Sequence, residues 1–202
     1  MKPTDILMRE HRVIEQVLNC LEKMAERCET EGVLDKKHSK DAVDFFRGFA
    51  DRCHHGKEEV HLFPMMESRG FPRGCGPTDV MRYEHDQGRS HIRAMDEAIN
   101  AASAGGRQAM ETFVREARAY VALLRQHIQK EDTCLFPMAN QAMSDEDQQT
   151  LMGLFDKVER EEIGQGVHEK RHAMAEELAR HYGVAGARFG PHEGDHGPAC
   201  SH

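Results

Sequence analysis

Apolar residues recur at steps of three and four along four long stretches of this 202-residue chain, and this spacing is the strongest constraint on its fold. Residues at such steps share one face of an α-helix. The stripe between residues 107 and 137 begins with Phe113, Ala117, Tyr120 and Leu124. Similar stripes occur within 4–31, 38–64 and 78–105. Aromatic residues make up only 6% of the chain and Trp is absent, which disfavours a β-sandwich or barrel.

Short polar or glycine-rich segments separate these stretches, at Gly32, residues 70–77 and Gly105–Gly106. Short connections place successive helices antiparallel to one another. A fifth amphipathic stretch follows from Ser144 to about Tyr182, and Gly164 and Gly166 are candidate breaks within it. We therefore predict an all-α fold, an antiparallel up-down four-helix bundle with an additional C-terminal helix.

This pattern predicts three segments. Residues 1–140 form the bundle and 141–182 a C-terminal helical extension, while the Gly/Pro/His-rich residues 183–202 form a disordered tail. A closed four-helix bundle has no room for a fifth helix in its core. We expect the extension to pack on the outside of its own bundle, with a homodimer built by this helix as the alternative to a monomer.

The charge of the chain bears on its partners and location. With 35 acidic and 27 basic residues the net charge is −8, which argues against nucleic acid and anionic membrane as partners. There is no apolar run long enough to span a membrane, and the first residues contain no apolar signal-peptide core. The six Cys form no C-x-x-C pair, which suits a reducing compartment. We predict a cytoplasmic protein.

Two copies of the motif H-x3-E-x3-L-F-P, at residues 54–64 and 127–137, interrupt the second and fourth apolar stripes. The i, i+4 spacing places His and Glu on one helix face, one turn apart. The Leu-Phe-Pro of each copy predicts that the helix ends there. Each copy therefore places an imidazole and a carboxylate where a core apolar residue is expected.

The first and third stripes are each interrupted by one His. His11 and His85 follow Thr4 and Thr78, near the starts of their helices, by the same number of residues. We therefore expect these two histidines and the two motifs to lie at one level of an antiparallel bundle. A buried unpaired carboxylate is costly, and a cation removes that cost. Six such groups exceed the needs of one tetrahedral zinc and suit two iron or manganese ions. The predicted metal ligands are His11, His54, Glu58, His85, His127 and Glu131.

On these motifs, together with Arg-Glu-His at 9–11 and EHDQGR at 84–89, the chain resembles the hemerythrin-like, HHE cation-binding family over roughly residues 4–140. The resemblance implies a four-helix bundle with a non-haem di-iron centre, in which two iron ions (Fe2+/Fe3+) share an oxo or hydroxo bridge. It also implies that Glu58 and Glu131 bridge the ions, and that the six residues named above are the ligands.

Two positions depart from the oxygen-carrying hemerythrins, which have a second His where this chain has Arg89 and an Asp where it has Glu131. The pattern is more similar to bacterial hemerythrin-like proteins and to di-iron proteins of iron–sulfur cluster repair. Candidates for a further ligand are His55, His38, His91, His168 and His172. On an α-helix His55 would lie about 100° off the ligand stripe, toward a neighbouring helix. Gly88, on the stripe one turn after His85, favours either close helix packing or room for a small ligand.

Three functions remain open at this point. The site binds or senses O2, NO or iron; or it is an oxidoreductase that acts on peroxide, O2 or NO, or donates iron in cluster repair; or it is a structural metal site. The sequence contains no flavin or nucleotide motif, so a reductase would need an external electron donor.

Overall fold

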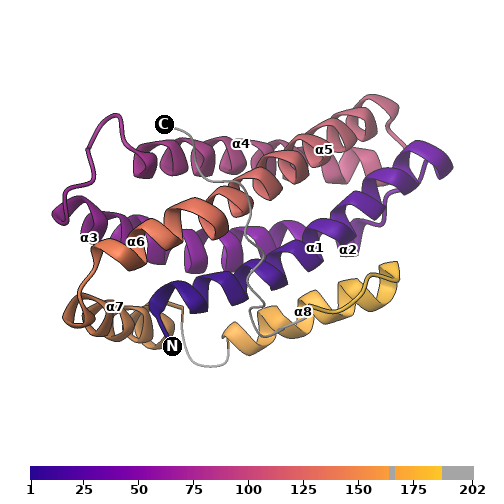
Figure 1. The fold of residues 1–202 in the computed structure, drawn as a ribbon. Coiled ribbons are helices and arrows are strands. Elements are labelled where there is room, and N and C mark those ends of the chain that lie inside the picture. Colours follow the sequence, from indigo (N-terminus) through magenta and orange to yellow (C-terminus); the bar gives the residue numbers. More distant parts are fainter. Residues whose placement is uncertain (164–166, 188–202) are drawn as a thin grey trace.

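The computed structural model describes residues 1–163 and 167–187, without the side chains of 161–163, 167 and 168. Within these ranges every regular element is helical. Three long helices are α1 (Pro3–Glu31), α4 (Pro77–Ser103) and α5 (Arg107–Lys130). A fourth helical run is made of α2 (Lys36–Phe45), η1 (Phe46–His55), η2 (Glu58–Leu62) and α3 (Phe63–Ser68). In Figure 1, α5 packs against α1 and α4, and α2 packs against α4 and α1.

Local sequence explains where these helices begin and end. The Asp35 side chain accepts a hydrogen bond from the backbone N–H of His38 and caps α2. Gly32 ends α1 in the left-handed region, with a φ of 67°, where a residue with a side chain is strained. Pro3 and Pro77 lie in the first turns of α1 and α4, where a missing N–H has no cost.

The helices widen into π-helical turns at the two repeated motifs. The first motif lies on η1 and η2, and η3 (Glu131–Leu135) begins at the Glu of the second. Our prediction that Leu-Phe-Pro ends each helix is wrong, because α3 and α6 (Phe136–Ala142) continue beyond it. A new α-helical segment begins directly after each π-helical turn. Pro64 and Pro137 lie in the first turn of these segments, α3 and α6, where proline is tolerated.

Apolar side chains form two buried clusters. One contains Ile14 of α1, Ile92 of α4 and Leu124 of α5. The other contains Leu7 of α1, Met81 of α4, Phe63 and Phe136. Leu7 precedes His11 and Met81 precedes His85 by one helical turn. On α1 and α4, His11 and His85 fall between residues of these two clusters. The core is thus divided by a polar layer.

The C-terminal stretch, predicted as one helix, contains α7 (Asp145–Lys157), η4 (Val158–Ile163) and α8 (Val167–Tyr182). Phe155 of α7 joins the cluster around Leu7, and α8 lies along α1 and α2 (Figure 1). Gln16 donates a hydrogen bond to the backbone oxygen of Ala175 at 3.1 Å. The stretch therefore covers helices of its own chain, as we expected, but Ala175 and Leu178 also join the main apolar cluster instead of remaining outside it.

Several predictions fall outside the described residues, namely the breaks at Gly164 and Gly166 and most of the predicted disordered tail, residues 188–202. The division of the chain at residue 140 stays a prediction. Among the described residues, no helix is long and apolar enough to cross a membrane.

Candidate metal centre

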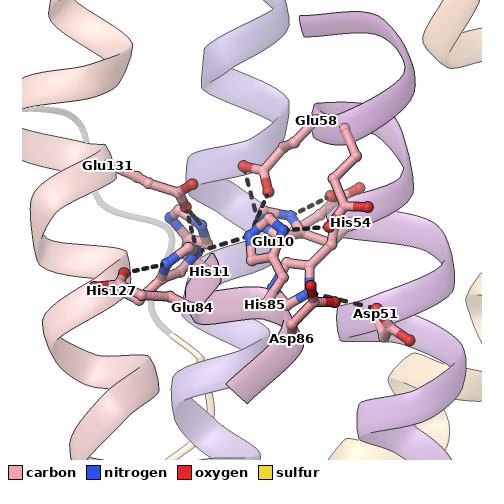
Figure 2. Close-up of polar contacts among 12 residues, drawn as sticks. Glu10, His11, Asp51, His54, Glu58, Glu84, His85, Asp86, His127 and Glu131 are labelled. Carbon is pink, nitrogen blue, oxygen red and sulfur yellow. Dashed lines mark hydrogen bonds and ion pairs between the residues drawn. The ribbon is translucent and has the colours of Figure 1, made fainter. Parts of the chain in front are cut away.

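The six predicted ligands meet in the polar layer, and all are almost completely buried, with 1% or less of their surface exposed. Figure 2 shows their side chains converging from the helices. The contributing elements are α1 for His11, η1 for His54, η2 for Glu58, α4 for His85, α5 for His127 and η3 for Glu131.

The side chains form two overlapping groups, in each of which the ligand atoms lie within 4.8 Å of one another. One group is His11, His54, Glu58 and Glu131, and the other is His55, Glu58, His85 and His127. Glu58 belongs to both. Glu131 Oε2 lies 3.2 Å from His11 Nε2 and 3.3 Å from His127 Nε2, so this carboxylate also reaches both groups. Two carboxylates therefore lie between two sets of imidazoles.

Among the candidates for a further ligand whose side chains the structure describes, His55 is the one that lies in the layer. Its ring stacks on that of His85, with centroids 3.7 Å apart and an interplanar angle of 11°. It lies on the π-helical η1, where successive side chains are separated by a smaller angle than on an α-helix, so it points closer to the direction of His54 than we predicted. Asp51 Oδ1 is 3.7 Å from His55 Nδ1, beyond hydrogen-bond distance.

His85 Nε2 and His127 Nε2 form a hydrogen bond with each other at 3.1 Å. The other atoms that point into the layer lack hydrogen-bond partners. They are His11 Nε2, His54 Nε2, both ring nitrogens of His55, and both carboxylate oxygens of Glu58 and of Glu131. Unsatisfied buried polar atoms are rare in folded proteins because each costs desolvation energy. A metal ion bound by these nitrogen and oxygen atoms would remove that cost. The donor set, imidazole with carboxylate, suits iron, manganese or zinc.

Four of the predicted ligands are histidines, and in each the ring nitrogen that faces away from the layer contacts a carboxylate. The Nδ1 contacts are His11 to Asp132 at 2.7 Å, His54 to Glu10 at 2.9 Å, His85 to Glu59 at 2.6 Å and His127 to Glu84 at 2.9 Å. When Nδ1–H donates to a carboxylate, Nε2 keeps its lone pair facing the centre of the layer. Such a partner fixes the ring orientation of a metal-binding His and raises its basicity.

Each of these carboxylates in turn contacts a cationic side chain. Asp132 pairs with Arg12, Glu10 with Lys57, Glu59 with Arg89 and Glu84 with Lys130. Arg89, which stands where the oxygen carriers have a second His, thus supports the His85 partner Glu59 and also binds Asp51 at 2.8 Å.

We did not predict these supporting residues from the sequence, although the pattern that identifies them is visible there. An acidic residue precedes His11 and His85 on α1 and α4, and another follows Glu58 and Glu131 in the motifs. The structure pairs them across helices, so that Glu10 serves His54 and Glu84 serves His127. An acidic residue beside each of His11, Glu58, His85 and Glu131 was therefore the available indication.

Burial and mutual contact shift the pKa values of the central groups in opposite directions. Burial, together with the nearby charge of Glu131, raises the pKa of Glu58 well above its ordinary value. For His127, burial alone would lower the pKa, but Glu131 and Glu84 raise it to about 9. Burial and the neighbouring imidazoles hold the pKa of His54 well below its ordinary value. With a pKa of about 9, His127 holds a proton at neutral pH in the metal-free layer, and the raised pKa of Glu58 favours its protonated form. A metal ion must displace such protons.

The other His candidates lie elsewhere. His38 groups with Asp35 and His181 at the junction of α2 and α8, and His91 contacts Glu116 at 2.8 Å. The His172 ring meets the Phe49 ring edge-on at 5.5 Å. The side chain of His168 is outside the described residues. Of the candidates whose side chains are described, only His55 lies beside the six predicted ligands.

In the described part of the chain every regular element is helical, and two buried His/Glu groups could hold metal ions. These features define a class, the helical metal-binding proteins. The family model for the hemerythrin HHE cation binding domain matches residues 2–139, and the chain belongs to this family.

The chain is similar in sequence to curated proteins whose names give no function. Uncharacterized proteins of Mycobacterium bovis and Mycobacterium tuberculosis are 26% identical over 159 residues, which is 79% of this chain. The chain spans only 62% of the length of these relatives. No solved structure matches the chain.

Proposed function

We propose that this chain is a non-haem di-iron protein that binds or senses O2 or NO. In this proposal α1, the run from α2 to α3, α4, and the run from α5 to α6 form the antiparallel four-helix bundle. One observation carries the proposal: the two ligand groups share Glu58, and Glu131 reaches both. A single ion would not use two sets of imidazoles with two carboxylates between them.

The proposed ligands follow from the two groups. His11 and His54 would hold one ion and His55, His85 and His127 the other, while Glu58 and Glu131 would bridge the two. Two bound iron ions would supply a redox-active pair with affinity for small diatomic ligands.

The residues of the chain orient this site and limit access of water to it. The Nδ1–carboxylate contacts keep the imidazoles turned inward. On the side of α3 and α6, Phe136 stacks on His11 with centroids 5.5 Å apart, and Phe63 lies 6.0 Å from His85. These buried rings close one side of the layer to water.

The absorption spectrum of the reduced, iron-loaded protein, recorded before and after exposure to O2, tests the proposal. A stable oxygen-dependent band that disappears when O2 is removed supports reversible binding. Irreversible oxidation would contradict a carrier and favour the alternative, an oxidoreductase acting on peroxide, O2 or NO, or an iron donor. A spectrum that does not respond to O2 or to NO would overturn the proposal.

A further inference from the structure

A cavity of about 320 Å³ lies between η1, α4 and α5 and is bordered by both exposed and buried residues. At its buried end are His55 and His85, which are 4% and 1% exposed. Both ring nitrogens of His55 lack hydrogen-bond partners, so the cavity ends on an unsatisfied buried imidazole. Its volume is at the low end for small-molecule sites.

The cavity is rich in positive charge although the chain is acidic. Four guanidinium groups and one carboxylate, that of Asp51, border it in a chain of net charge −8. Arg89 is paired with Asp51 and Glu59, and Arg47 with Asp96. Arg52 and Arg93 are exposed and form no ion pair with any other residue that the structure describes. Their charges are therefore available to a ligand at the mouth of the cavity.

Gly88 contributes to the open space. It lines the cavity on α4, opposite Tyr120, and a Cβ at this position would lie 3.3 Å from Tyr120 Cε2. A larger side chain would push the tyrosine ring aside or occupy the cavity. We gave Gly88 two interpretations, room for a small ligand and close helix packing, and this geometry supports both. The helices approach closely at Gly88, and no side chain fills the space beside it.

We propose that this arginine-lined cavity admits small inorganic anions to the His55 side of the metal centre. The inference rests on the proposed function, because the anion reaches the buried imidazoles that would hold a metal ion. A cleft lined by one sign of charge with low-dielectric walls concentrates ions of the opposite charge. The weakly hydrated, planar guanidinium group suits oxyanions and other small anions. A neutral diatomic ligand gains nothing from Arg52 and Arg93.

The test uses azide as the probe, titrated into the oxidised, iron-loaded protein and followed by absorption at low and high ionic strength. The double variant Arg52→Gln/Arg93→Gln is compared with Arg9→Gln/Arg180→Gln, which removes two exposed positive charges on α1 and α8 instead. We expect the cavity variant to lose on the order of tenfold in azide affinity, and the control less than about twofold. Added salt should weaken azide binding to the unmodified protein.

Two further measurements separate the possible causes. The rate at which the reduced protein reacts with NO, a neutral molecule, should be the same in both double variants. Gly88→Leu, which fills the cavity without changing the charge, should slow both azide and NO. Equal azide affinities in the two double variants, or no effect of salt, would overturn the cavity proposal and leave the di-iron centre intact. A protein without iron would overturn the proposed function and the cavity proposal together.

Discussion

Lys57 and Lys130 occupy the same position in the two motifs, but only Lys57 is buried. Its side chain is 0% exposed and contacts Glu10, itself 5% exposed, and Glu159 at 2.7 Å. The side chain of Lys130 is 43% exposed and contacts Glu84. The substitutions Lys57→Met and Lys130→Met therefore remove the same charge from two equivalent ion pairs that differ in burial.

The expected losses of stability differ severalfold. Removal of one partner from a buried ion pair costs about 3–5 kcal/mol, since the remaining charge is left in a poorly solvated environment. Removal of an exposed partner costs about 0–1 kcal/mol. For a domain of this size these losses correspond to a decrease in Tm of roughly 6–20 °C for Lys57→Met and at most about 4 °C for Lys130→Met.

Urea denaturation of the metal-free proteins, followed by far-UV circular dichroism, measures both losses without a contribution from metal binding. The double variant Glu10→Gln/Lys57→Met should recover part of the lost free energy of unfolding, because it removes the buried charge of Glu10 together with that of Lys57. If Lys57→Met and Lys130→Met destabilise the protein equally, the interpretation of the Lys57 pair as a buried support of His54 is wrong.

Three further predictions concern the metal layer and the C-terminal stretch. Glu58→Ala and Glu131→Ala should lose more metal than His91→Ala, because a bridging carboxylate serves both ions; equal metal contents, measured by mass spectrometry, would contradict the ligand assignment. Metal binding at neutral pH should release protons, because the pKa of Glu58 is raised by burial and that of His127 by Glu131 and Glu84, against the effect of burial, to about 9. Metal affinity should thus increase with pH, and calorimetry in buffers with different ionisation enthalpies would detect the protons; an unchanged heat would refute this. Truncation after residue 140 should lower stability strongly but keep the metal, and a truncated protein as stable as the full chain would show that α7 and α8 do not cover the core.

The sequence predicted the helices and the six central residues because both depend on spacing within one element. Apolar residues at steps of three and four identify a helix face, and a His or Glu on that face must be buried with it. The repeated motif then placed His54 and His127 at the same level. These inferences require no knowledge of how neighbouring helices contact each other.

What the sequence did not predict depends on backbone hydrogen bonding and on contacts between helices. The π-helical turns leave the apolar pattern readable as an α-helix, so neither the continuation beyond Pro64 nor the inward position of His55 follows from it. The pairing of Glu10 with His54 depends on which helices are neighbours. The burial of Lys57 contradicts the usual preference of lysine for the surface and becomes understandable only from its contacts with Glu10 and Glu159.

The metal content of the purified protein tests the central claim most directly. Elemental mass spectrometry of protein from iron-supplemented cells should find two iron ions per chain, and the iron content should decrease when Glu58 is replaced by Ala. About one zinc ion per chain, unaffected by the iron supplied during growth, would contradict a di-iron centre built on the two groups that share Glu58.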